Sequence, residues 1–365
     1  MVSARLWSRL GLVAAALVLA AAAPAAPAGK ARPPVGEDAL MASGRATALK
    51  VAARPDYPNP GMAYSCLALA SLAQQGDRGA VQGVRSSADA LMARLRRDGR
   101  GRPIGWPFQG TRHCAGPGTT DAFGDKTCNT ADTTYSFQTG LAATCLARAT
   151  IVTGQRRYAE TARQILNRWA SVASERPCRG CVLFYYSDSP NDRGRSVRNT
   201  NVLMGMAAAW TWRALRTPDM RILAEGVAAT EDREARNDNR GYLGLDDDAY
   251  RKDPPRQSRR IENHAVLVAK GLVDIGWALG DRRTIGLGRE VMIDWHQCRG
   301  ADCSKIPCPT WSGGERCADA QAVMPCVLPD DPVLGPACRR AIGRSTRFSY
   351  LQTWAVADGR LFRRR

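Results

Sequence analysis

A helical segment that recurs along the chain constrains the fold more than any other feature of these 365 residues. The segment 65–72, rich in small and apolar residues, matches 144–151, and each is followed by a glycine, Gly76 or Gly154. Further copies follow at steps of 63 residues, at 208–217 and at 271–277. A repeat of this kind predicts stacked structural units, because each unit buries its apolar face only against its neighbours.

Each copy is followed by a second helical segment of a different character. In 156–174, charged residues alternate with apolar residues at helical spacing, such as Tyr158, Ile165 and Trp169. The first segment is apolar on nearly all sides, which predicts an enclosed inner helix. The second segment has a polar face that would be exposed to solvent, which predicts an outer helix. The expected outer helices are 37–54, 79–98, 156–174, 219–237 and 282–297, and the expected inner helices are 61–75, 134–153, 199–216, 261–279 and a short 347–358.

Helical hairpins of this kind resemble the α/α-toroid folds, in which they form a closed or partly open ring. The resemblance covers most of residues 37–297 and is architectural. It implies an all-α fold, an incomplete ring of about five helical hairpins, with less than a tenth of the residues in strand. An open solenoid of the same hairpins is the alternative. The irregular repeat spacing, 79 and then 63 residues, and the long insertions at one end of the hairpins favour the toroid.

The N-terminus has the three-part layout of a secretory signal peptide. Arg5 and Arg9 precede an apolar run that ends at Ala23, and a small-residue stretch ends at Ala28. The run is shorter than the about twenty residues that span a bilayer, and no later segment could span one. We therefore expect a periplasmic or secreted protein with no membrane span after cleavage. The expected parts are a signal peptide (1–28), the toroid domain (29–297), a Cys-rich insertion (298–346), and a final short helix with a basic tail (347–365).

Twelve cysteines follow the signal peptide, and an exported protein is expected to hold most of them in disulfides. Cys66 and Cys145 occupy matched places on inner helices and either bridge or remain buried thiols. The Cys178–Cys181 pair has the spacing of half a zinc site, but no second pair completes it, so we predict no metal and no other cofactor. Six cysteines are expected to pair among themselves in the C-terminal insertion: Cys298, Cys303, Cys308, Cys317, Cys326 and Cys338.

The formal net charge of +18 creates a field that attracts polyanions. Outside the cell the expected partner is an acidic polysaccharide and not nucleic acid. The alternative is an arginine-rich surface that reflects composition alone. The oligomeric state stays open.

Polar residues recur at the start of each expected inner helix. If these helices run parallel, the residues lie around one mouth of the ring, and N-capping is the alternative explanation for them. These residues are Asn59, Gln138, Asn201, His264 and Gln352. The long loops at this end carry aromatic and basic residues suited to sugar rings. The candidate substrate-binding residues from these loops are Trp106, Tyr186, Arg240 and Arg260. Gln138 and Asn59, at the helix starts, are candidates for the same role.

The stretch from Arg260 to His264 resembles the Asn-His pair that opens an inner helix in the alginate and chondroitin lyases of this fold. The resemblance implies that Asn263 helps to neutralise a uronate carboxylate and that His264 manages protons during β-elimination or epimerisation. Tyr242 is the candidate general acid, and Tyr250 is the alternative. Arg240 or Arg260 would assist Asn263 and His264, and Asn201 is expected to line the same cleft. The chain departs from the alginate lyases directly after the pair, where Ala265 and Val266 replace aromatic residues.

Two other functions stay open. A glycoside hydrolase uses two carboxylates across the sugar. Asp132 and Glu262, which precede the second and fourth expected inner helices, are the natural pair, with Asp188 as a substitute. A protein that binds polysaccharide without catalysis is the third possibility.

Overall fold

The computed structural model describes residues 36–107, 129–236, 265–296 and 323–363. The chain divides into two units, Met1–Pro33 and Pro34–Arg365, and every element described below belongs to the second. Among the described residues, no helix is long and apolar enough to cross a membrane.

Ten helices of the described part match the expected hairpins. The inner helices are α2 (Asn59–Gln74), α4 (Ser136–Thr153), α6 (Arg198–Leu215), α9 (Ala265–Leu279) and α13 (Tyr350–Arg363). The outer helices are α1 (Glu37–Ala52), α3 (Arg78–Ala93), α5 (Arg156–Val172), α7 (Pro218–Arg236) and α10 (Arg282–His296). Most residues of the inner helices are buried, whereas the outer helices bury one face. The contrast read from the sequence is therefore confirmed.

The inner helices run parallel to one another. Contacts between neighbouring inner helices advance in the same direction along both members of each pair. Between α2 and α4, Cys66 meets Cys145 and then Ser71 meets Arg148; between α4 and α6, Gly140 meets Leu203 and then Arg148 meets Trp210. Between α6 and α9, Val202 meets Gly271 and then Gly205 meets Ile275; between α2 and α13, Tyr64 meets Trp354 and then Ser71 meets Asp358. The five inner helices therefore begin at one end of the ring, which we call the mouth.

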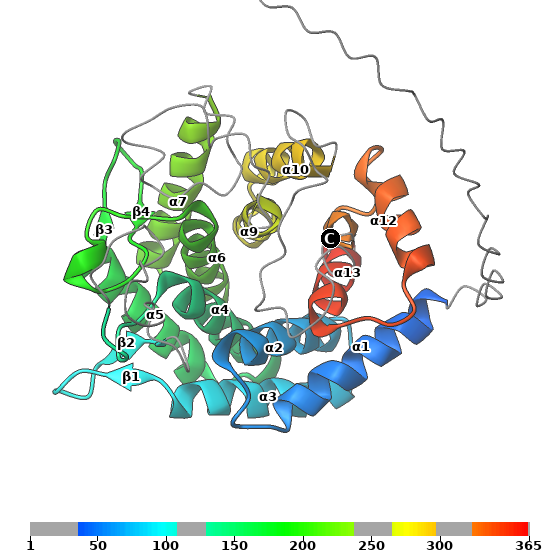
Figure 1. The fold of residues 1–365 in the computed structure, drawn as a ribbon, viewed down its shortest axis with the longest axis horizontal. Helices are drawn as coiled ribbons and strands as arrows, with labels where there is room; N and C mark the ends of the chain where they lie inside the picture. Colours follow the sequence, from blue (N-terminus) through cyan, green and yellow to red (C-terminus); the bar gives the residue numbers. More distant parts are fainter. Residues whose placement is uncertain (1–35, 108–128, 237–264, 297–322, 364–365) are drawn as a thin grey trace, which may run out of the picture. The chain divides into compact units, whose positions relative to one another are not determined.

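Figure 1 shows α2, α4, α6, α9 and α13 following one another around the middle of the domain, with the outer helices outside them. The two ends of the incomplete ring, α9 and α13, meet through side chains, and Lys270 Nζ lies 2.7 Å from Asp358 Oδ2. Arg148 of α4 also binds Asp358, at 2.9 Å, and donates to Ser71 of α2. Lys270 pairs with Asp274 in the same fully buried cluster. A buried charged network thus joins four of the inner helices, and the architecture is an α/α toroid.

Strand is scarce in the part of the chain that the structure describes, as the fold class predicts. Two antiparallel pairs occur: β1 (Arg96–Arg97) with β2 (Pro103–Gly105), and β3 (Ser174–Glu175) with β4 (Leu183–Phe184). Each pair lies in a loop between an outer helix and the next inner helix, so both belong to the mouth end. Beyond residue 322 come η4 (Met324–Val327) and α12 (Leu334–Arg344), before α13. A 3-10 turn, η1 (Pro190–Asp192), precedes α6.

Three disulfides lie within the described residues. Cys66 and Cys145, which the sequence left as a bridge or as thiols, form a bridge between α2 and α4. Cys326 pairs with Cys338, so two of the six C-terminal cysteines pair as expected. The other four of the six, Cys298, Cys303, Cys308 and Cys317, lie outside the described residues.

Candidate functional site

Capping is the wrong explanation for three of the polar residues at the mouth. The N-cap positions of α2, α4 and α6 are held by Pro58, Tyr135 and Val197, and none of these helices has a side-chain cap. Asn59, Gln138 and Asn201 instead stand inside the first turn with buried side chains. Their side chains therefore have roles other than capping these helices.

The capping explanation is right for the fifth copy. Ser349 Oγ accepts from the backbone N–H of Gln352 (3.3 Å), and Gln352 Oε1 accepts from the backbone N–H of Ser349 (2.8 Å). This reciprocal pair is a capping box. It also explains why α13 begins at Tyr350 and not at residue 347, as the sequence predicted.

Asn201 joins three elements at the start of α6. Its Oδ1 accepts from the N–H of Phe184 in β4 (3.0 Å), and its Nδ2 donates to Glu231 Oε1 of α7 (3.2 Å). Glu231 is buried, which raises the pKa of its carboxyl, although Arg198 opposes that shift from 3.7 Å. Glu231 was not singled out from the sequence, since it falls on an outer helix among other charged residues.

Asn59 has a similar anchoring role at the start of α2. Arg94 Nη1 donates to Asn59 Oδ1 (3.0 Å), and Asn59 Nδ2 donates to the carbonyl of Pro107 (3.4 Å). The side chain therefore holds the loop that precedes α4 against α2.

Gln138, in the first turn of α4, differs from both asparagines. Its side chain is only 2% exposed, and its Oε1 has no hydrogen-bond partner. A buried amide oxygen without a donor costs about 1–3 kcal/mol, so such a group calls for an explanation.

Two carboxylates meet on one arginine just before the start of α4. Arg96 of β1 lies 2.9 Å from Asp132 and 3.7 Å from Asp188, through different guanidinium nitrogens. The Asp188 carboxylate also accepts from the N–H of Thr134 (2.8 Å). The side chain of Asp132 is 66% exposed and that of Asp188 13%. The hydroxyl of Thr130, together with Arg96, holds the pKa of Asp132 below its usual value, so Asp132 is ionised at neutral pH.

Sequence reasoning named Asp132 and its substitute Asp188 but not Arg96, which brings them together. Arg96 stands in a run of basic residues that carries no motif. Only the β1–β2 hairpin turns it toward the start of α4.

The aromatic residues expected on the wall of the mouth behave differently from each other. Trp106 is fully buried and donates from Nε1 to the carbonyl of Leu91 (2.8 Å), so it anchors its loop and presents no ring face to a sugar. Tyr186 is half-buried, and its ring meets Tyr135 edge-on at 5.6 Å between centroids. Of the two, Tyr186 alone keeps an accessible side chain at this end.

The remaining candidate residues lie outside the described residues: Arg240, Tyr242, Arg260, Glu262, Asn263 and His264. Helix α9 begins at Ala265, the next residue after His264. The position predicted for His264, inside an inner helix that begins at 261, falls on residues that the structure does not describe and stays a prediction.

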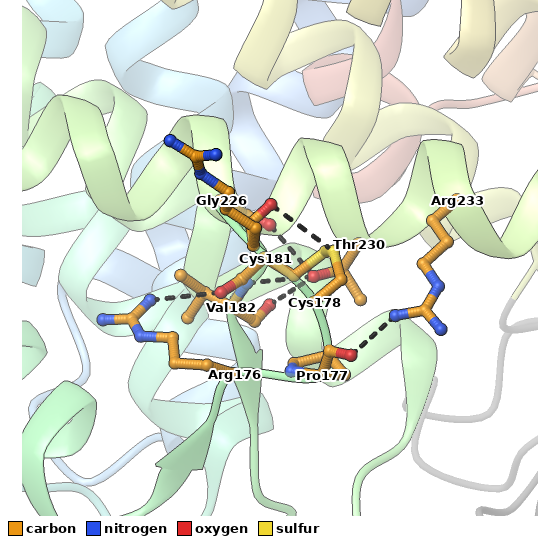
Figure 2. The surroundings of a disulfide bond; sticks show 9 residues. Arg176, Pro177, Cys178, Cys181, Val182, Gly226, Thr230 and Arg233 are labelled. Atoms are coloured by element: carbon orange, nitrogen blue, oxygen red, sulfur yellow. Dashed lines mark hydrogen bonds between the residues drawn. A yellow bond between two sulfur atoms is a disulfide. The ribbon is translucent and has the colours of Figure 1, made fainter.

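Cys178 and Cys181 pair with each other in the turn between β3 and β4. Figure 2 shows this turn docked against α7, where Thr230 Oγ1 donates to the carbonyl of Val182 (2.8 Å) and Arg233 donates to that of Pro177 (2.6 Å). Within the described residues, no group of three or more His, Cys, Asp or Glu side chains could hold a metal ion.

No protein-family model matches the chain, and no curated protein matches it. Solved structures do match, and those named here have α/α-toroid folds. A cellobiose 2-epimerase from Spirochaeta thermophila is 11% identical, with a TM-score of 0.54, over 85% of this chain and 87% of that chain. A GH76 α-mannanase from Bacteroides thetaiotaomicron is 10% identical, with a TM-score of 0.53, over 83% of this chain and 87% of that chain.

An unsaturated glucuronyl hydrolase from Bacillus sp. GL1 is 16% identical, with a TM-score of 0.42, and the match covers 63% of this chain and 60% of that chain. At 10–11% identity, the other two matches show the fold alone. The resemblance to α/α-toroid carbohydrate-active proteins, inferred from the repeats, is confirmed at the level of architecture.

Proposed function

We propose that the protein is an enzyme that acts on an acidic polysaccharide at the mouth of the ring. The observation that carries this proposal is the cluster just before α4, where Asp132 and Asp188 share Arg96, in the loop that leads to the unpartnered Gln138. Carboxylates supply general acid or base groups, and buried amides supply directed hydrogen bonds to sugar hydroxyls.

Two further facts support the substrate class. The net charge of +18 favours an anionic polymer. Structures that share the fold are named as a cellobiose 2-epimerase and an α-mannanase, so this fold accommodates saccharide chemistry. Export through the signal peptide 1–28 would place the protein where such polymers occur.

Elimination or epimerisation at a uronate is the first candidate reaction. In this proposal Asn263 neutralises the uronate carboxylate, with Arg240 or Arg260 assisting, and His264 removes the proton from the adjacent carbon. Tyr242 donates a proton, to the leaving glycosidic oxygen in elimination or back to the same carbon in epimerisation. Asn201 positions the start of α6, since its amide is already used by Phe184 and Glu231.

Hydrolysis is the second candidate, and the paired carboxylates favour it. Asp132 is exposed and ionised, which suits a base that activates water. Glu262, as proposed from the sequence, would be the acid. Asp188 would hold Arg96, and through it Asp132, in place.

Product chemistry separates the two reactions. We would incubate the chain from residue 29 onward with alginate, polygalacturonate and chondroitin, and with a neutral mannan as the control. Ultraviolet absorbance reports the unsaturated product, and a reducing-end assay reports cleavage. Both signals on the acidic polymers indicate a lyase, and reducing ends alone indicate a hydrolase. Acidic polymers that show no change in length or in uronate configuration would contradict the proposal.

Variants assign the reaction to residues. Loss of a general acid or base costs about 10²- to 10⁴-fold in rate. His264→Ala should show that loss if the enzyme is a lyase or epimerase, and Asp132→Asn should show it if the enzyme is a hydrolase. Asp89→Asn is the matched control, because Asp89 also binds an exposed arginine, Arg157 at 2.7 Å, but lies between the outer helices α3 and α5.

A further inference from the structure

A second basic site lies beside the mouth, on the other side of the β1–β2 hairpin. A cavity of about 770 Å³ opens between this hairpin and the C-terminal half of α5. The arginines that line it are Arg97, Arg100, Arg102 and Arg168, and Gln164 and Asn167 add amide groups. Its volume falls in the range of about 300–1,000 Å³ that is typical of ligand sites. We call this cavity the arginine pocket.

The charge of the arginine pocket is largely uncompensated. Arg102 pairs with Asp98 at 2.8 Å. Within the described part of the chain, neither Arg97, Arg100 nor Arg168 forms an ion pair, and Arg168 Nε is buried without a hydrogen-bond partner. Arginines gathered without carboxylates repel one another, so a bound anion would lower the energy of the site.

The walls of the pocket are held by buried contacts. Trp169, the neighbour of Arg168 on α5, is buried and donates from Nε1 to the carbonyl of Ile104 in β2 (2.9 Å). Asp98 accepts from the backbone N–H groups of Arg100 and Arg102, both at 2.9 Å, and this fixes the turn of the hairpin. The guanidinium groups therefore project from a scaffold that exists before any ligand binds.

One residue step separates the pocket from the mouth. Arg96 binds Asp132 and Asp188, whereas its chain neighbour Arg97 lines the arginine pocket. Successive side chains of a strand point to opposite faces, so a polymer that crosses the hairpin from the mouth could reach the pocket on its other side.

Resting on the proposed function, we infer that the arginine pocket binds carboxylate or sulfate groups of the same acidic polysaccharide, on sugar units beyond the one that reacts. Planar guanidinium groups bind such oxyanions through paired, charge-assisted hydrogen bonds. The pocket would favour long acidic chains over short ones, because only long chains reach both sites at once.

The test is direct binding of fluorescent acidic oligosaccharides of increasing length to the chain from residue 29 onward. Arg100→Gln/Arg168→Gln should weaken binding of long oligomers by about 10-fold or more and leave short ones unchanged. Arg100→Gln alone keeps the test clear of folding effects, because Arg100 is an exposed turn residue. The matched control is Arg156→Gln/Arg221→Gln, which removes the same charge from exposed helical positions paired with Glu160 and Glu225.

The outcomes for the pocket and for the enzyme are distinct. Loss of long-oligomer binding without any conversion of polymer supports the pocket and contradicts the enzyme. Conversion of polymer, with pocket variants that bind like the control, overturns the pocket and leaves the enzyme standing. Equal loss of binding to single-stranded DNA in the same variants would overturn the assignment to a saccharide.

Discussion

At the scale of residues, a substitution of Gln138 tests whether its side chain serves the substrate or the fold. Its buried Oε1 has no partner, so replacement by methionine removes an unsatisfied group of similar size. We predict that Gln138→Met leaves the melting temperature unchanged or slightly raised and lowers turnover of the polymer.

The control for Gln138 is Gln352, which holds the same place on α13 but uses its Oε1 as a cap. Gln352→Met should therefore lower the free energy of unfolding by about 1 kcal/mol. A large loss of stability in Gln138→Met would mean that its side chain serves the fold and not the substrate.

Asp274 gives the buried network a pH dependence. Burial raises the pKa of its carboxyl from the usual 3.8 to about 6, with Asp358 adding to the rise and Lys270 opposing it. Because the folded value is raised, the contribution to stability is fully present below pH 3.8 and is lost as the pH rises through about 6.

We predict that Asp274→Asn removes this dependence. Between pH 4 and pH 7, the stability of the wild type measured by chemical denaturation should fall relative to that of the variant. A difference between the two proteins that stays constant over this range would contradict the assignment of the titration to Asp274.

At the scale of elements, helices were predictable because their signals are local. The start of α5 at Arg156 and the end of α4 before Gly154 follow from periodicity and a glycine stop, and both agree with the structure. The β1–β2 hairpin was missed, since two or three residues with paired arginines carry no strand pattern.

Close packing of inner helices is a second property of the elements. A Cβ on Gly140 of α4 would lie 2.7 Å from the carbonyl carbon of Leu203 on α6, so Gly140→Ala must push the two helices apart. We predict a loss of about 1–3 kcal/mol in the free energy of unfolding. Gly286→Ala on α10 is the control, because nothing lies within 4 Å of the added carbon. That change should be neutral or stabilising by up to about 1 kcal/mol.

The Cys66–Cys145 disulfide links neighbouring inner helices across 79 residues. In the chain-entropy model, a loop of this length is worth about 4.5 kcal/mol, and the loop of Cys178 and Cys181, three residues apart, about 2 kcal/mol. Denaturation of the two double alanine variants measures the difference. A greater loss from the Cys178/Cys181 variant would show that the short bridge, and not the inner one, supports the ring.

At the scale of the whole molecule, the repeat register predicted which residues gather at one end, because parallel inner helices bring equivalent positions together. It placed Asn59, Gln138 and Asn201 correctly at helix starts. The register did not predict that Asp132 and Asp188 share Arg96, or that an arginine pocket forms next to them. Those contacts depend on how loops fold between elements, and the sequence has no periodic signal there.

The position of bound substrate tests the central claim most directly. Hydrogen exchange of the His264→Ala/Asp132→Asn variant, which is designed so that neither proposed reaction consumes the ligand, would be compared with and without an acidic oligosaccharide. We predict added protection in 129–138 and 183–201, where α4 and α6 begin. Protection confined to the opposite end of the ring, around 75–77, 154–155 and 216–217, would contradict a site at the mouth.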